Sequence, residues 1–306
     1  MSESLFRRLC VAHPESLQSL TYQYRMNGDV MALCNALVYS GRLRCGNPLV
    51  EQHCLVLPNL GAIPDSIERP SETRTGNVVG GMDNGGTEHC CDRNDGVGQC
   101  HSNPPPGGRE SWLRDVLNPD RRVIFLDTDG IAVVGEGHQC HQQERPFVGL
   151  ETRAAGGGRR DAARGSLVNE VECALVRLLV WGLAKAGLDL GEAGVICPYR
   201  SQVHLLQSQM GEAFPSVEIN TIDKYQGRDK QVVVVSFVRS NPEGAVGELL
   251  RDWRRLNVAL SRAKGKLVLV GSLQTLARCS ILFSLVDILK ARDWVYSLPP
   301  KAHLAY

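Results

Sequence analysis

The chain lacks a net charge of any size and lacks long apolar segments. Its 306 residues carry 34 Lys and Arg against 33 Asp and Glu, which gives a formal net charge of +1. No global basic field therefore attracts nucleic acid, and any strand binding must come from a local patch. The sequence also has neither an apolar run of about eighteen residues nor the apolar core of a signal peptide, so we expect no membrane span and no secretion.

The cysteines lack the pattern of a disulfide scaffold. Their number, 11, is odd, and Cys34, Cys173 and Cys197 lie in apolar segments, where small hydrophobic residues belong. We therefore expect reduced thiols. The alternative is a zinc site in the middle of the chain, built from His89, Cys90, Cys91, Cys100, His101, Cys140 and His141. No two cysteines have the C-x₂₋₄-C spacing of such sites, so we expect no metal.

Residues 58–166 differ in composition from the rest of the chain. They hold more than half of the 31 glycines, together with runs of three prolines and three glycines, and few aromatic residues. Such a segment buries too little apolar surface to offset its chain entropy. We expect a low-complexity, largely disordered insertion, interrupted by one short buried strand near 122–128 (RVIFLDT).

Strand and helix patterns alternate after the insertion. The segment 167–186 has apolar residues at helical spacing and ends at Gly187, and short apolar runs follow at 194–197, 217–220, 232–238 and 266–271. Runs of this kind, separated by helical segments, predict an α/β fold: one parallel sheet with helices on both faces. We expect 1–57 and 167–291 to form this domain, and 292–306 to be a C-terminal tail.

Three short strings carry a family resemblance: QYRM at 23–26, EINTIDKYQGRDK at 218–230 and RRLNVALSRAK at 254–264. They resemble the second RecA-like domain of superfamily 1 helicases, in the branch that contains the nonsense-mediated decay helicase. Within it, the wording is most similar to the eukaryotic replication ATP-dependent helicase/nucleases. The resemblance covers 1 to about 57, a stretch around 123–129, and 167 to about 290.

This resemblance implies a nucleotide site with two catalytic arginines, Arg25 and Arg262, directed at the γ-phosphate of ATP. A guanidinium suits that role because it is always charged and forks onto two phosphate oxygens. The alternative for each is a surface salt bridge. Tyr24 would stack on adenine, unless it is a core residue with a bonded hydroxyl. The other implied nucleotide-binding residues are Gln23, Gln226, Gly227, Arg228 and Asp229, where relatives often have Glu in place of the last.

The resemblance also implies contacts to the backbone of single-stranded DNA, from Pro198, Tyr199, Arg200, Asn220, Thr221 and Asp223. Hydroxyl, amide and guanidinium groups position a phosphate backbone without reading bases. Thr221 and Asp223 could equally cap a turn. The basic segment 251–266 is a further candidate for strand binding, and its alternative is a solvated helix face.

The phosphate-cradling G-x-x-x-x-G-K-[ST] loop does not occur in the sequence, nor does the acidic "DEA" strand end that would hold Mg²⁺. We therefore expect a C-terminal part of a 5′ to 3′ DNA helicase motor, as a fragment, split gene or truncated gene. A first RecA-like domain, in cis or trans, would complete it and hold Mg²⁺, and any iron–sulfur cluster would lie outside this chain. Alone, the chain should be inactive. Single-stranded or flap DNA is the expected partner, and the nucleus, with the mitochondrion as a second site, the expected location. The alternatives are a free-standing nucleic-acid-binding module and an RNA helicase of the same branch.

Overall fold

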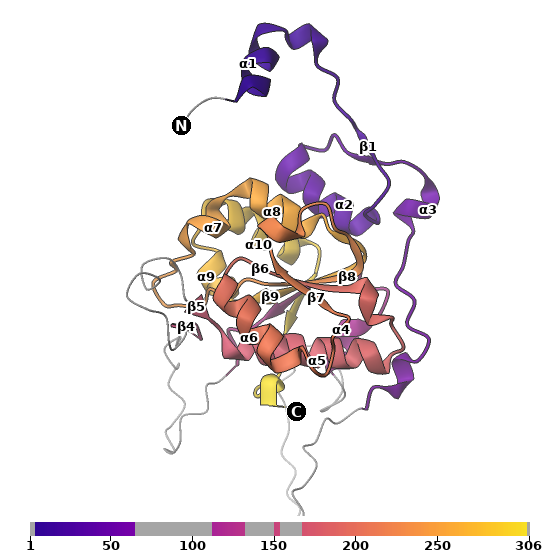
Figure 1. Ribbon diagram of the computed structural model, residues 1–306, viewed down its shortest axis with the longest axis vertical. Coiled ribbons are helices and arrows are strands. Elements are labelled where there is room, and N and C mark those ends of the chain that lie inside the picture. The colour runs from indigo at the N-terminus through magenta and orange to yellow at the C-terminus, as the bar shows by residue number, and fades with distance from the viewer. Residues whose placement is uncertain (1–3, 65–111, 132–149, 154–166, 305–306) are drawn as a thin grey trace, which may run out of the picture.

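The computed structural model describes residues 4–64, 112–131, 150–153 and 167–304. Its centre is a parallel sheet of six strands, counted over these residues, in the order β10-β3-β9-β8-β6-β7 (Figure 1). The strands are β3 (Val123–Asp127), β6 (Ala193–Cys197), β7 (Glu218–Thr221), β8 (Lys230–Ser236), β9 (Ala263–Gly271) and β10 (Val295–Ser297). This confirms the predicted α/β class with a parallel sheet.

The middle strands are buried on both faces of the sheet. In β8 the run Val232–Val235 pairs with β9 on one side and β6 on the other, so Val233 lies opposite both Leu267 and Gly194. Strands that are covered on both faces have continuous apolar runs instead of alternating polar and apolar residues. This pattern made these strands predictable from the sequence.

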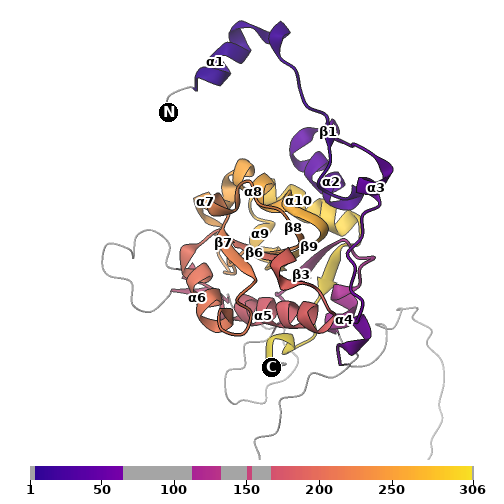
Figure 2. The same ribbon diagram turned by 45° about the vertical axis from the view of Figure 1, so that its right-hand side comes forward.

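Helices cover the two faces in separate layers (Figures 1 and 2). One apolar core contains residues of α4 (Trp112–Leu117), α5 (Glu170–Lys185) and α6 (Arg200–Met210). The other contains residues of α2 (Gly28–Cys34), α8 (Trp253–Leu260) and α10 (Ser280–Ala291). Helix α5 begins at the N-cap Asn169 and is followed by Gly187, whose φ of +84° suits a residue without a Cβ.

Shorter elements connect these layers. Helix α1 (Leu5–Ala12) has no buried residue and stands clear of the sheet and its helices in both views. The other elements are η1 (Pro14–Ser16), β1 (Tyr22–Gln23), the π-helix η2 (Asn35–Tyr39), β2 (Arg44–Cys45), α3 (Pro48–Glu51), η3 (Leu60–Ala62), β4 (Thr152–Arg153), β5 (Leu167–Val168), η4 (Leu190–Glu192), η5 (Asp223–Tyr225), α7 (Gly247–Arg251), α9 (Leu273–Leu276) and η6 (Ala302–Leu304). No helix of the described ranges is long and apolar enough to cross a membrane.

Part of the expected insertion belongs to the central fold. The strand expected near 122–128 is present as β3, but it pairs with β9 and β10 inside the sheet instead of forming an island. Helix α4, which the sequence did not predict, buries Trp112, Leu113, Val116 and Leu117 against α5. The prediction of disorder over the rest of 58–166, and all the candidate zinc ligands, lie outside the described residues.

Residues 292–304, which the sequence predicts as part of a C-terminal tail at 292–306, include a strand and buried side chains. Strand β10 adds to the edge of the sheet beside β3, and Leu298 and Ala302 are buried in the core that α5 covers. The strand has only three residues, half buried or exposed, so its sequence carries little of the apolar pattern that identifies a strand.

Candidate functional site

The two groups of predicted site residues lie at opposite edges of the sheet. Asp229 and Arg262 directly precede β8 and β9, so they lie at the amino-terminal edge. Arg200 follows β6, and Thr221 ends β7, which places both at the carboxyl-terminal edge. Because all six strands run parallel, the two edges are separated by the length of the strands.

Asn27 attaches the predicted QYRM turn to the amino-terminal edge. Its backbone N–H donates to Lys264 O at 3.1 Å, and its buried side-chain Nδ2 donates to Gly265 O at 2.7 Å. Arg25 then lies beside the junction of α8 and β9, where its Nη1 donates to Ser261 O at 3.3 Å. Two arginines from distant parts of the sequence are thereby brought to one edge.

Gln23 fixes the shape of that turn. Its Oε1 accepts from the backbone N–H groups of Arg25 and Met26 at 2.9 and 2.8 Å, and its Nε2 donates to Met26 O at 2.7 Å. The side chain is thus engaged with its own turn. The structure places Gln23 as a residue that positions Arg25, and its predicted contact to the nucleotide stays a prediction.

Arg262 is folded back on the end of α8. Its Nε donates to Val258 O at 3.0 Å and its Nη2 to Ser261 Oγ at 3.1 Å, and the residue is 9% exposed. Burial lowers the pKa of the guanidinium, the nearby charge of Arg25 lowers it further, and Asp229 raises it. An arginine stays charged under such shifts. A phosphate at this edge would replace the internal bonds of this group.

Asp229 is the carboxylate that lies among the cations of the amino-terminal edge. Its Oδ2 lies 2.9 Å from Lys264 Nζ, and its Oδ1 lies 3.9 Å from Arg25 Nε. Together with Arg262, three cations surround this carboxylate. The excess of positive charge suits an anionic ligand.

Tyr24 presents its ring to solvent. The residue is 68% exposed, and the ring rests against Gly46, where a Cβ would come within 2.0 Å of a ring carbon. The alternative that Tyr24 is a core residue is therefore wrong. An exposed ring that packs against the backbone of Gly46 can still offer a face for stacking.

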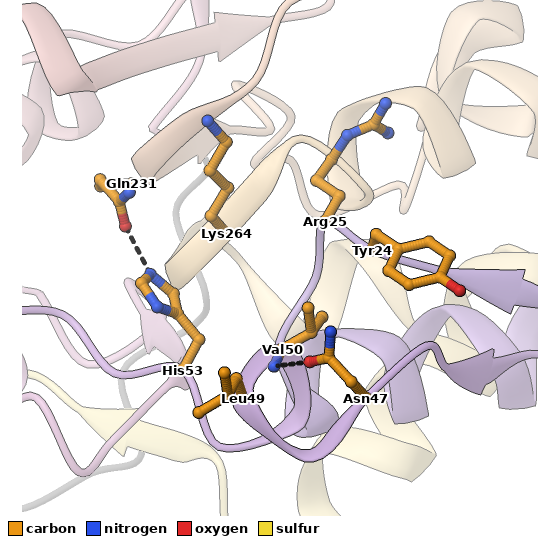
Figure 3. A pocket seen from close by; sticks show the side chains of 8 residues that line it. All are labelled: Tyr24, Arg25, Asn47, Leu49, Val50, His53, Gln231 and Lys264. Carbon is orange, nitrogen blue, oxygen red and sulfur yellow. Dashed lines mark hydrogen bonds between the residues drawn. The ribbon is translucent and has the colours of Figure 1, made fainter.

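Tyr24, Arg25 and Lys264 line one pocket of about 270 Å³ (Figure 3). The sequence did not single out the other lining residues, Asn47, Leu49, Val50, His53 and Gln231. His53 and Gln231 share a hydrogen bond of 2.7 Å at one side of the pocket, and Asn47 Oδ1 accepts from Val50 N at 2.9 Å. The volume of the pocket is near the lower end of the range for ligand pockets.

The remaining predicted nucleotide residues form the turn before β8. Gly227 has a φ of +85°, a conformation that favours glycine. Arg228 pairs with Glu218 at the start of β7. Gln226 is exposed. The structure thus shows Arg228 engaged by an acid, which a phosphate would have to displace.

At the carboxyl-terminal edge, the predicted DNA contacts differ in accessibility. Pro198 and Tyr199 are buried, and the Tyr199 hydroxyl donates to Val246 O at 3.3 Å. Arg200, the first residue of α6, is exposed. Asn220 donates to Glu218 Oε1 at 3.2 Å and Asp223 pairs with Arg255 at 3.0 Å, while Thr221 is half buried. Arg200 is the member of this set that offers an open cation.

The basic segment 251–266 does not form one patch. Lys266 is fully buried, and its Nζ donates to Asn118 O at 2.9 Å and to Arg121 O in the turn between α4 and β3. Burial lowers the pKa of this lysine to about 7. Arg254 lies over the ring of Trp253, 4.7 Å from its centroid.

A buried polar cluster lies beneath the carboxyl-terminal edge. Glu172, fully buried on α5, accepts from Ser236 Oγ at 2.6 Å, Val238 N at 2.9 Å and Asn169 Nδ2 at 3.2 Å. Burial raises the pKa of this carboxyl to about 8. Val238 has a φ of 69°, unusual for a β-branched residue, and both of its backbone polar groups are bonded to this cluster.

Comparison with known proteins gives a family and close relatives. The family described as "AAA domain" matches residues 1–274. The chain is 37% identical over 305 residues to the "DNA replication ATP-dependent helicase/nuclease DNA2" of Xenopus tropicalis, covering 99% of this chain and 23% of that protein. The human protein of the same name is 34% identical over 303 residues, with 99% and 23% covered. That of Saccharomyces cerevisiae is 31% identical over 307 residues, with 100% and 16% covered. The chain thus spans less than a quarter of the length of these relatives.

Proposed function

Because this chain belongs to the AAA domain family, which matches it over residues 1–274, we propose that it is the second RecA-like motor domain of an ATP-dependent DNA helicase. The relatives, named as DNA replication ATP-dependent helicase/nucleases, confirm the resemblance that the motifs indicated. The observation that carries the proposal is the cation cluster at the amino-terminal edge, where Arg25, Arg262 and Lys264 surround Asp229 beside the exposed ring of Tyr24.

The donor set of the pocket fits a nucleoside triphosphate. An exposed aromatic ring can stack on a base, and an excess of cations can hold phosphates. Bound ATP would supply the phosphoanhydride bond whose hydrolysis drives the motor. Phosphoryl transfer to water depends mostly on positioning and on neutralising the charge that develops. In this proposal Arg25 and Arg262 supply that positive charge, after Arg262 leaves its internal bonds to Val258 and Ser261.

The other half of the site would come from a first RecA-like domain, in cis or in trans. That domain would carry the Mg²⁺ ligands and the phosphate-cradling loop, whose G-x-x-x-x-G-K-[ST] motif does not occur in this sequence. Closure of the two domains on ATP would then bring the arginines to the γ-phosphate.

The carboxyl-terminal edge would hold the DNA strand, in single-stranded or flap form. Arg200 provides a phosphate contact, and the buried Tyr199 holds the loop before α6 through its bond to Val246 O. We also propose the 5′ to 3′ direction, and replication and repair in the nucleus, because these are implied by the resemblance.

A chimaera tests the proposal. The region of the Xenopus tropicalis relative that aligns with this chain would be replaced by the 306 residues, and the same region of the human relative would make a control chimaera. We expect ATP hydrolysis stimulated by single-stranded DNA, and unwinding of a 5′-tailed duplex. Strand binding without hydrolysis, while the control chimaera hydrolyses ATP, would support the binding-module alternative. Stimulation by RNA alone would support the RNA helicase.

Arg262→Ala in the active chimaera tests the assignment of the arginine. Hydrolysis should fall by roughly a factor of 10³ or more, because the group acts on charge that develops in the transition state. Affinity for single-stranded DNA should change by no more than a few-fold, since Arg262 lies at the opposite edge from Arg200. Loss of DNA affinity with hydrolysis intact would show that Arg262 belongs to a nucleic-acid surface.

A further inference from the structure

Lys264 lies at an irregularity in the pairing of β8 with β9. Lys230 pairs with Ala263 and Val232 with Lys266, so β9 advances one residue more than β8 over this interval. The extra residue is a β-bulge, a device that turns a side chain away from the regular alternation and is frequent next to active sites. The bulge lies between Ala263 and Lys266, so only Ala263 separates it from Arg262.

The bulge gives two lysines of one strand different environments. Regular alternation would direct Lys264 and Lys266, two residues apart, to the same face of the sheet. Instead Lys266 is fully buried and bonded to the turn between α4 and β3, while the Lys264 side chain is 35% exposed and lines the pocket. Figure 3 shows Lys264 and Arg25 both extending toward the top of the view from the two sides of the pocket.

Asn27 stabilises the backbone of the bulge. It bonds to the carbonyl groups of Lys264 and Gly265, at 3.1 and 2.7 Å. The bonds that fix the turn carrying Arg25 therefore also fix the strand segment carrying Lys264. One buried residue, Asn27, thus fixes the backbone positions of both Arg25 and Lys264 relative to each other.

Charge is unbalanced where these side chains meet. Asp229 lies 2.9 Å from Lys264 Nζ and 3.9 Å from Arg25 Nε, and its charge also acts on Arg262. One carboxylate cannot neutralise three cations. Without Asp229, the like charges of Lys264 and Arg25 would repel each other in the absence of a ligand.

We propose that Lys264 is a third phosphate-contacting cation of the nucleotide pocket, and that Asp229 acts as its counter-ion until a polyphosphate enters. This inference rests on the proposed function, since it assigns the pocket to a nucleoside polyphosphate. Lys264 contributes to binding of the phosphates in the ground state, whereas Arg262 contributes to turnover. The pocket takes the phosphates from the side of β9 and the base from the side of Tyr24.

Binding to the 306-residue chain tests the inference, with ATP, tripolyphosphate and adenosine titrated by calorimetry at low ionic strength. Lys264→Gln should weaken the binding of ATP and of tripolyphosphate about tenfold, which is the equivalent of about one charge-assisted hydrogen bond. The affinity for adenosine should stay unchanged. Lys264→Arg should restore binding of both polyphosphates. The matched control is Lys290→Gln, at an exposed lysine of α10, which should behave as wild type. Asp229→Asn should tighten binding of tripolyphosphate.

The outcomes separate this inference from the proposed function. If Lys264→Gln binds both polyphosphates as wild type does while Arg25→Gln weakens them, Lys264 has no such role and the nucleotide site stands. If neither Lys264→Gln nor Arg25→Gln changes polyphosphate binding, both the role of Lys264 and the proposed nucleotide site are wrong. In the chimaera, Lys264→Gln should raise the KM for ATP and keep kcat within a few-fold. A fall in kcat with KM unchanged would overturn the ground-state role.

Discussion

At the scale of single residues, Gly46 limits where the ring of Tyr24 can lie. An added Cβ would come within 2.0 Å of the ring, so Gly46→Ala should push the aromatic face away from the pocket. We expect a several-fold higher KM for ATP in the chimaera, with kcat little changed, because stacking stabilises bound substrate and transition state alike. Gly61→Ala is the matched control, since nothing lies within 4 Å of its Cβ and its φ is ordinary. Equal KM values for the two variants would show that Tyr24 does not stack on the base.

Glu172 should make stability depend on pH. Burial raises the pKa of this carboxyl from 4.5 to about 8, and the charge of Glu151 adds to the rise. The folded state therefore holds a proton that the unfolded state releases, so this contribution is complete below pH 4.5 and is lost as the pH rises through about 8. The free energy of unfolding of wild type, relative to Glu172→Gln, should fall on the order of 1–3 kcal/mol between pH 5 and pH 8.5.

Urea denaturation at the two pH values measures this difference. Comparing wild type with Glu172→Gln cancels other titrating groups, such as Lys266, whose pKa burial lowers to about 7 and whose effect has the opposite sign. A pH-independent difference between the two proteins would show that the carboxyl is charged throughout the range, held so by the three donors around it.

At the scale of elements, strand β10 completes the sheet. Leu298, directly after it, is 5% exposed and packs in the core that α5 covers, whereas Leu304 in η6 is 37% exposed. Leu298→Ala should lower the free energy of unfolding by about 2–5 kcal/mol, the usual cost of a cavity at a buried leucine. Leu304→Ala serves as the control and should cost less than about 1 kcal/mol. Equal midpoints in urea would mean that 292–306 is a tail, as the sequence suggested.

The sequence predicted those elements whose pattern is local. The runs in β6, β8 and β9 are strongly apolar because both of their faces are covered, and Gly187 marks the end of α5, whereas the predicted start at 167 is strand β5 in the structure. Helix α4 has six residues and lies in a region rich in Gly and Pro, and β10 has three. Both take their stability from the neighbours they pack against, which no local pattern records.

Some residues of the candidate site could be predicted from the sequence, and others could not. Arg25, Arg262 and Asp229 lie in recognisable strings, and the structure brings them together at one edge. The segment 47–53, which supplies Asn47 and His53 to the pocket, contains no motif and reaches it through tertiary packing. Lys264 lies in a basic segment of the sequence, but the bulge between it and Lys266 depends on pairing between strands, which the sequence alone does not show.

At the scale of the whole molecule, the sheet separates two kinds of chemistry. The cations that suit a polyphosphate lie where β8 and β9 begin, and the exposed Arg200 lies where β6 has ended. Within this chain the length of the strands lies between the two edges, and no residue proposed for one ligand is shared with the other. The two activities should therefore be separable by substitution.

The isolated 306-residue chain should bind single-stranded DNA without hydrolysing ATP. Its own residues include the cations of the amino-terminal edge, but the sequence contains no G-x-x-x-x-G-K-[ST] motif, and charge stabilisation without positioning of phosphate and Mg²⁺ gives little rate. Fluorescence anisotropy with a labelled oligonucleotide should show binding that weakens with salt. Arg200→Ala should lower the affinity and reduce the salt slope by about one phosphate contact, while Lys290→Ala should not.

Phosphate release from ATP, measured on the same preparation, should stay at the level of the buffer with and without the oligonucleotide. Hydrolysis that persists through a second purification and disappears in Arg262→Ala would contradict the prediction, because it would mean that this edge alone positions the triphosphate. Binding that Arg200→Ala leaves unchanged would instead move the strand to another surface. The exposed arginines of α7 and α8, Arg251 and Arg254, would then be the next to substitute, since they present positive charge away from the nucleotide pocket.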